Sequence, residues 1–130
     1  MKKVALFFLV LLLIYYFLIF NNNPCKNKSA LTYKIDSKNY CLLTANNQAE
    51  WGKGLMFYKK PVDFDGMIFI FPSKQIQNFW NKNTYLDLNL YWMDDEKVVG
   101  KSVLPSILKS KETITVNSGK EVNRVVEIIK

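Results

Sequence analysis

Apolar and polar residues alternate most clearly over residues 86–93. Successive side chains of a strand point to opposite faces of a sheet, so this pattern predicts a strand with one buried face. The expected buried side chains are Leu86, Leu88, Leu90 and Trp92. Residues 67–71 are apolar without interruption and are followed by Pro72. That run predicts a second strand, buried on both faces.

Further strands are expected around this pair. Residues 31–35 and 40–44 predict two strands joined by a polar turn. Shorter strands are expected at 98–99 and at 114–116. The sequence from Asn47 to Glu50 is typical of a helix start, and Gly52 and Gly54 predict that this helix is short.

Two more helical segments are predicted toward the C-terminus. Residues 73–80 favour one or two helical turns. Ser118 and Glu121 have the spacing of a capping box. The apolar residues that follow recur at helical spacing, at Val122, Val125, Val126 and Ile129. This pattern predicts a final amphipathic helix packed on the sheet.

The N-terminal run over residues 4–20 carries no charged side chain, and Lys2 and Lys3 precede it. Its length and flanks predict one transmembrane helix with the N-terminus in the cytoplasm. Asparagines and Pro24 follow the run, where signal-peptide cleavage requires small residues, so an uncleaved anchor is favoured. The expected localisation is the cell membrane, single-pass, with an extracytoplasmic domain.

The expected organisation is an anchor at 1–21, a linker at 22–30 and one domain at 31–130. The fold class is mainly β (α+β): a compact, barrel-like β domain with two or three short helices, behind one N-terminal transmembrane helix. Two cysteines, Cys25 and Cys41, would join the linker to the first strands if they form a disulfide, which an extracytoplasmic location permits. A free thiol and a small buried residue remain the alternative.

Charge and composition narrow the function classes. The net charge of +7 rests almost entirely on lysine, since Arg124 is the one arginine, and lysine does not offer the bidentate geometry of base recognition. We expect no nucleic-acid partner. The chain has no histidine, so the usual general base and metal ligand are missing. No cofactor and no metal site are expected.

Three motifs resemble those of domain of unknown function family 192, also called uncharacterised protein family 0127. They are Gly54-Leu55-Met56, then Gly66-Met67 with Phe69, then Phe79-Trp80 with Lys82-Asn83-Thr84. The resemblance covers most of residues 31–129 and implies a β-rich, barrel-like domain, often behind an apolar N-terminal segment. It implies no catalytic residues. Asn81 stands where the family has methionine, and Asn89 where it usually has aspartate.

The structural interpretation of these motifs assigns Gly54 and Gly66 to special backbone positions and Met56, Met67, Phe69 and Phe71 to the core. On this interpretation Trp80 packs, and Asn83 and Thr84 bond the loop backbone to hold a turn. The functional interpretation is a concave site in which an aromatic face and amide groups bind a sugar or peptide. Its candidate ligand-binding residues are Trp80, Lys82, Asn83, Thr84, Asp87 and Asn89.

We therefore expect a binding or interaction module for an envelope component, which could be a polysaccharide, a peptide or a protein. The alternative is a hydrolase of an envelope polymer that uses carboxylates such as Asp63, Asp65 and Asp87. Two carboxylates about 5–10 Å apart in one cleft would favour the enzyme. Adhesion of a lysine-rich face to anionic lipid is a third possibility.

Overall fold

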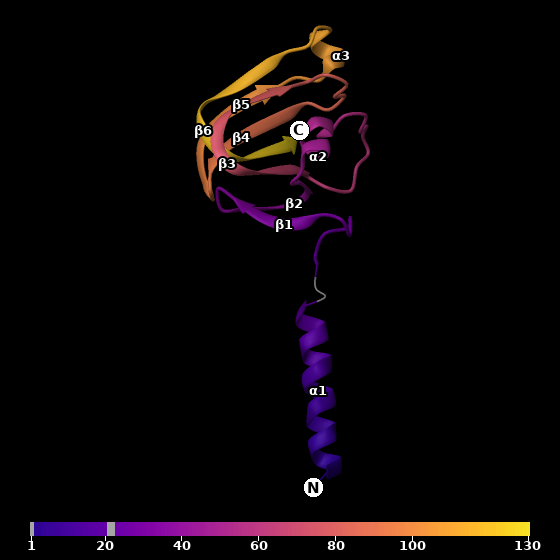
Figure 1. Ribbon diagram of the computed structural model, residues 1–130. Helices are drawn as coiled ribbons and strands as arrows, with labels where there is room; N and C mark the ends of the chain where they lie inside the picture. The colour runs from indigo at the N-terminus through magenta and orange to yellow at the C-terminus, as the bar shows by residue number, and fades with distance from the viewer. Residues whose placement is uncertain (1, 21–22) are drawn as a thin grey trace.

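The computed structural model describes residues 2–20 and 23–130 of the chain. Residues 1, 21 and 22, which fall at the ends of the predicted anchor and at the start of the predicted linker, lie outside the described residues. The elements follow in the order α1 (Lys2–Phe20), β1 (Leu31–Ile35), β2 (Lys38–Ala45), α2 (Gln48–Lys53), β3 (Gly66–Trp80), β4 (Leu88–Asp94), β5 (Lys97–Leu104), α3 (Ile107–Ser110) and β6 (Thr115–Ile129) (Figure 1).

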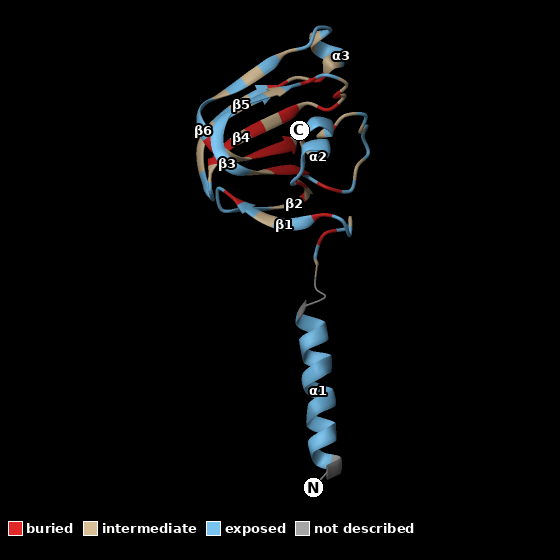
Figure 2. Cartoon of the chain, in the orientation of Figure 1, coloured by how far each residue is buried: buried red, intermediate tan, exposed pale blue. Residues whose placement is uncertain are grey.

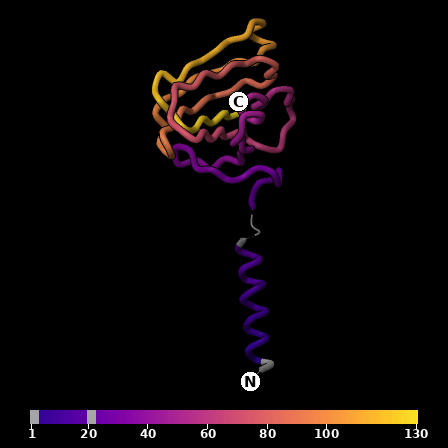
Figure 3. The backbone as a smooth tube through the Cα atoms, in the orientation of Figure 1, coloured from indigo at the N-terminus to yellow at the C-terminus, as the bar shows by residue number. Residues whose placement is uncertain are grey.

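The six strands form one sheet in the order β1-β2-β3-β6-β4-β5. Neighbours pair antiparallel, except that β2 and β3 run parallel. A parallel pair needs a crossover connection, and α2 with the loop after it supplies that connection. Figures 1 and 3 show the sheet curving around α2 and this loop, with the C-terminus beside them.

The expected barrel-like closure is not present. The sheet is open, because β1 and β5 occupy its two edges and do not pair with each other. The two edges approach each other at the turn between β1 and β2. There Asp36 forms an ion pair with Lys101 of β5, with a nitrogen–oxygen distance of 3.1 Å. The coarser expectation, a mainly β domain with a few short helices, is confirmed.

The longest pairing joins β3 and β6, and it bends. Its register shifts between Ile70 and Gln75 and again between Ile76 and Asn78. Such irregularities bend a strand pair and increase its twist. The bend returns Phe79 to the sheet, where its ring lies 4.8 Å from that of Phe69 and 5.7 Å from that of Trp92. The far end of this strand pair, where residues 78–80 of β3 pair with 115–117 of β6, therefore bends back over the core.

Apolar side chains are buried on both faces of the sheet, in two clusters. The larger cluster includes Phe69, Leu90, Trp92 and Val125, and Leu55 of the loop after α2 packs with it. The smaller cluster, on the opposite face, includes Leu42, Ile68, Met93, Val126 and Ile128. The apolar face predicted for residues 86–93 is confirmed, since its four expected residues are all buried. The strand itself begins at Leu88, and Met93 on its other face is buried as well.

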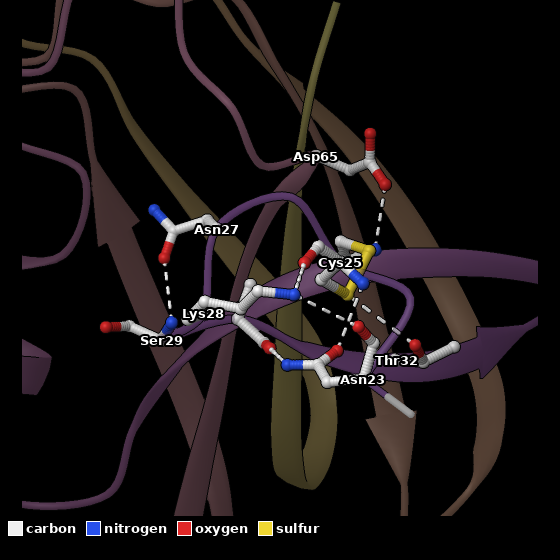
Figure 4. Close-up of a disulfide and its surroundings, with 9 residues drawn as sticks. Asn23, Cys25, Asn27, Lys28, Ser29, Thr32 and Asp65 are labelled. Atoms are coloured by element: carbon white, nitrogen blue, oxygen red, sulfur yellow. Dashed lines mark hydrogen bonds between the residues drawn. A yellow bond between two sulfur atoms is a disulfide. The ribbon is translucent and has the colours of Figure 1, made fainter. Parts of the chain in front are cut away.

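Cys25 and Cys41 form a disulfide with their Cα atoms 5.6 Å apart. Figure 4 shows Asn23, Lys28 and Thr32 gathered around Cys25. The Asn23 side chain accepts from the Cys25 amide and donates to the Ala30 carbonyl. The segment before β1 is thus fixed to the sheet by a covalent bond and by local hydrogen bonds.

The N-terminal run forms helix α1, and its described side chains from Val4 to Ile19 are exposed (Figure 2). Within residues 2–20 and 23–130, no helix is long and apolar enough to cross a membrane. The expected transmembrane helix is therefore not found.

Two helix predictions are wrong. Residues 73–80 belong to β3, and the segment that follows Ser118 belongs to β6. Val122, Val125, Val126 and Ile129 do recur at helical spacing, but residues 125–128 are all buried, on alternate faces of the sheet. Pairing with both β3 and β4 outweighs the local helical pattern.

Candidate functional site

A pocket with a cavity volume of about 130 Å³ lies between α2, the bent part of β3 and the end of β6. One side is formed by α2 and the turn that ends it, and the other by β3. Its lining comprises Trp51, Gly52, Lys53, Gly54, Leu55, Met56, Phe69, Phe71, Gln77, Asn78, Phe79, Trp80, Thr84 and Glu127.

The α2 side of the pocket is fixed by caps at both ends of the helix. The side chain of Asn47 accepts from the Glu50 amide, as the sequence predicted. The helix ends at Gly54, whose φ is 48°. A Cβ atom there would lie 3.2 Å from the Phe69 ring. Glycine therefore provides both the left-handed backbone and the room for α2 to pass over Phe69.

The aromatic walls are held in place by their own contacts. The indole nitrogen of Trp51 donates to the carbonyls of Ala45 and Ile70, 3.1 Å away in each case. Its ring lies 5.1 Å from the ring of Phe71. Phe69 and Phe79 meet edge to face. These rings form a preorganised apolar surface rather than a mobile one.

Glu127 is the unexpected residue of the pocket. It lies on β6 between Met67 of β3 and Leu90 of β4, and only 4% of its surface is exposed. Its Oε2 atom is buried and has no hydrogen-bond partner among the described residues. Burial raises the pKa of this carboxyl from 4.5 to about 8. The group is therefore roughly 90% protonated at neutral pH and can donate a hydrogen bond.

The backbone at Glu127 also explains Gly66. A Cβ atom on Gly66 would lie 1.8 Å from the Glu127 carbonyl oxygen. This position accepts only glycine because the two strands approach so closely. Of the other motif residues, Leu55, Met67 and Phe69 are buried in the core, and Met56 is half-buried in the pocket wall.

Two of the candidate ligand-binding residues, Trp80 and Thr84, line this pocket. Trp80 lies at the rim, 49% exposed, and the Lys82 ammonium is 5.3 Å from the centre of its ring. Thr84 is buried, and its hydroxyl donates to the Lys82 carbonyl. Asn83 has a φ of 53°, and its carbonyl accepts from the Phe57 amide. Trp80 and Thr84 thus lie at the pocket, Lys82 contacts the Trp80 ring, and Asn83 shapes the turn.

Asp87 and Asn89 do not line this pocket. Asp87 accepts from the Ser106 amide at 3.0 Å and pairs with Lys109. The Lys109 ammonium and the Ser106 amide lower the pKa of Asp87. Asn89 lines a separate hollow with Tyr91 and Lys101. The predicted concave site is therefore divided, and its strand half lies elsewhere.

The other carboxylates proposed for hydrolysis have separate structural partners. Asp63 accepts from the Asn27 side chain at 2.9 Å. Asp65, which Figure 4 shows beside the disulfide, accepts from the Cys41 amide at 2.7 Å. Neither lines the pocket, whose one carboxyl among the described residues is Glu127. No cluster of three or more potential metal ligands occurs within residues 2–20 and 23–130.

Sequence reasoning gave no role to three buried polar residues, Asn81, Ser106 and Glu127. Asn81 is fully buried: its side chain donates to the Pro105 carbonyl and to Ser110, and accepts from the Ile114 amide, all at 2.8 Å. These bonds hold the loop that carries Trp80 and Thr84. For Glu127, the available signal was an acid between two apolar pairs of residues, which fits an inward position on a buried strand.

Comparison with known proteins connects this domain to a family and to a fold. The model of family DUF192, described as Uncharacterized ACR, matches residues 31–130. Comparison with curated proteins finds no matching sequence.

Two solved structures are similar to the domain. One is a protein of Sinorhizobium meliloti 1021, provisionally assigned as a transcription regulator, with 20% identity and a TM-score of 0.63 over 75% of this chain and 77% of that one. The other is a protein of unknown function from Novosphingobium aromaticivorans DSM 12444, with 25% identity and a TM-score of 0.61 over 75% of this chain and 70% of that one. The first similarity establishes the fold alone.

Proposed function

This chain belongs to the DUF192 family, whose biochemical role is uncharacterised, and we propose that its domain is a binding module for a component of the cell envelope. One observation carries the proposal: the buried Oε2 of Glu127 lies in a pocket and has no partner among the described residues. Buried polar atoms are otherwise almost always hydrogen-bonded. A ligand atom that bonds to Glu127 would satisfy the acid.

The size of the pocket limits what enters it. About 130 Å³ is close to the roughly 150 Å³ of an apolar cavity that holds one benzene molecule. The pocket therefore takes one end group or side chain of a polysaccharide, peptide or protein, and the rest of the ligand lies outside. The half-exposed Trp80 ring and the Lys82 ammonium next to it are placed to contact that outer part.

The geometry does not favour the hydrolase alternative. Glycoside hydrolysis ordinarily needs two carboxyl groups about 5–10 Å apart across one cleft. Among the described residues, the pocket contains one carboxyl, and Asp63, Asp65 and Asp87 bind separate structural partners. A binding role requires no second acid.

The proposal includes attachment of the domain to the cell membrane through residues 4–20, with the N-terminus cytoplasmic and the domain extracytoplasmic. A long run of exposed apolar side chains in α1 supports attachment, because large exposed apolar surfaces mark membrane or protein contacts. The disulfide supports an oxidising compartment. Carbonate extraction tests membrane attachment, and protease treatment of intact cells tests which side the domain faces. Release by carbonate or full protection of the domain would contradict this part.

The binding role is tested with the full chain in detergent micelles, incubated with an envelope extract and analysed by native mass spectrometry. The comparison is between wild type, Glu127→Leu and Asn89→Ala. Leucine at 127 removes the unpartnered acid, so the variant should fold and lose the bound mass. Asn89→Ala is the matched control, because Asn89 lines a different hollow.

Two results would contradict the proposal. If Glu127→Leu keeps the same bound mass as wild type, the ligand does not use this pocket. If Asn89→Ala loses the mass while Glu127→Leu keeps it, the binding surface is the strand face predicted from the sequence. Far-UV circular dichroism on each variant separates loss of binding from loss of folding.

A further inference from the structure

The pocket also indicates the class of chemical group that it accepts. Given the binding role proposed above, on which this inference rests, we infer that the pocket takes a flat, ring-sized group bearing a carbonyl or carboxylate oxygen. That oxygen accepts a hydrogen bond from the Glu127 carboxyl. Ligands of this class are neutral or anionic, and cationic groups are excluded.

The first step of the argument is the protonation state of Glu127. Its Oε2 is buried without a partner, and no cation pairs with it in the described residues. Burial alone raises its pKa to about 8, so near neutral pH the carboxyl holds a proton. A protonated carboxyl has an O–H group to donate and needs an acceptor on the ligand.

The second step is the charge around the pocket. The ionisable groups of the described lining are Glu127 and, on α2, Lys53. The β3 side chains and Thr84 add none, and on the same face Glu127 is flanked by Met67 and Leu90. A cationic ligand would have to ionise Glu127 in an apolar site and lie near the Lys53 ammonium. An anionic or neutral ligand meets neither obstacle, and the net charge of +7 attracts anions.

The third step is the shape of the lining. Rings of Trp51, Phe69, Phe71, Phe79 and Trp80 line a volume of about 130 Å³. A flat ring stacks on such faces or meets their edges, and its size matches this volume. The ring therefore fills the apolar part of the pocket while its oxygen substituent reaches Glu127.

Three probes of similar size test the inference with the full chain in detergent micelles. Benzoate is anionic, benzamide is neutral, and N-methylpyridinium is a permanent cation. Binding is measured by saturation-transfer NMR of each probe, with empty micelles as the blank. We expect benzoate and benzamide to bind at about pH 6 and N-methylpyridinium not to bind. Because the ionised acid cannot donate and repels an anion, benzoate affinity should fall at least about tenfold between about pH 6 and about pH 9.

Variants connect this pH dependence to Glu127. Glu127→Gln keeps an N–H donor but does not titrate, so it should bind benzoate with an affinity that stays constant across the same pH range. Glu127→Leu should bind about tenfold more weakly than wild type at about pH 6, since it has no donor. Lys53→Gln should weaken benzoate more than benzamide, because it removes charge from the lining.

The outcomes separate this inference from the binding role itself. If N-methylpyridinium binds best, with an affinity that rises through about pH 8 and is lost in Glu127→Gln, the pocket is a cation site. The inference is then wrong, while the binding role stands. If none of the three probes binds and the extract leaves no mass on wild type, the binding role is wrong as well. Benzamide binding that is equal in wild type and Glu127→Leu would also overturn the inference.

Discussion

Replacing Glu127 with glutamine should change the pH dependence of folding stability in a defined direction. The two side chains have nearly the same shape, but glutamine cannot ionise. Burial raises the pKa of Glu127 from 4.5 to about 8 in the folded protein. One pKa unit corresponds to about 1.4 kcal/mol, so the raised pKa lowers the free energy of unfolding by about 5 kcal/mol well above pH 8, where the buried acid is ionised. At pH 7, where the folded chain holds the proton that the unfolded chain releases, it lowers this free energy by about 3 kcal/mol.

The sign follows from which state holds the proton. Between pH 4.5 and about 8 the folded chain keeps the Glu127 proton, whereas the unfolded chain releases it. The free energy of unfolding therefore falls as pH rises through this window and is insensitive to this group outside it. Asp87 acts in the opposite direction, because its lowered pKa gives stability that is lost on acidification. The difference between wild type and Glu127→Gln cancels Asp87 and all other shared groups.

The assay is urea unfolding of residues 23–130 with the disulfide intact, followed by tryptophan fluorescence at pH values from about 4 to about 9. We expect the stability of Glu127→Gln relative to wild type to rise by several kcal/mol across this range, most steeply between about pH 5 and about pH 8. A fixed offset from the buried amide does not affect the slope. A difference that stays constant with pH would show that folding does not shift the pKa of Glu127, and would refute the reasoning.

Three further predictions concern the scaffold. Gly66→Ala should destabilise by more than about 4 kcal/mol in urea unfolding, because its Cβ would lie 1.8 Å from a β6 carbonyl oxygen; Gly52→Ala, with nothing within 4 Å, is the control and should be neutral or slightly stabilising. Asn81→Ala should cost about 3 kcal/mol in the same assay through lost hydrogen bonds, and an unchanged midpoint would contradict the role assigned to it. Replacing Cys25 and Cys41 with serine opens a loop of sequence separation 16 and should cost about 3 kcal/mol. Equal stability of the serine variant and the oxidised wild type would contradict that value.

The local pattern of apolar and polar residues predicted β4 and the first part of β3. Leu88, Leu90 and Trp92 lie on the buried face of β4 because one face of that strand packs on the core. The continuous apolar run at 67–71 belongs to β3, as expected. Alternating and unbroken apolar runs predict a strand correctly where each face of that strand stays either buried or exposed along its length.

Pairing between distant segments explains why the two helix predictions are wrong. Residues 73–80 and 115–122 form one long bent ribbon, and each half is stable as a strand only beside the other. The capping-box pattern at Ser118 lies instead within β6, at an irregularity of its pairing with β3, where Gly119 has a φ of 64° and the Ser118 hydroxyl donates to the Lys120 carbonyl. Placing residues 122–129 on a helix put Glu127 on its polar side, and the strand turns it inward.

The candidate site was predicted only in part, because it too depends on segments that are distant in sequence. Trp80 and Thr84 were identified from the dense mixture of aromatic and polar residues, and they do line the pocket. The shared strand face of Asp87 and Asn89 predicts that they join the same site, but that face lies away from the pocket. The pocket brings together α2, β3 and β6, which are distant in sequence, so composition could identify its rim but not its base.

The destabilisation of the folded state by Glu127 is itself an argument for function. An apolar side chain of similar size at this position would avoid the cost of a buried, unpartnered acid, which is about 3 kcal/mol at pH 7. The other buried polar side chains, such as Asn81 and Thr84, make hydrogen bonds that help hold the fold. Glu127 makes none through Oε2, and it lines a cavity with preorganised aromatic walls. A destabilising group that coincides with a cavity is explained by a ligand that satisfies it, because nothing in the scaffold requires the acid.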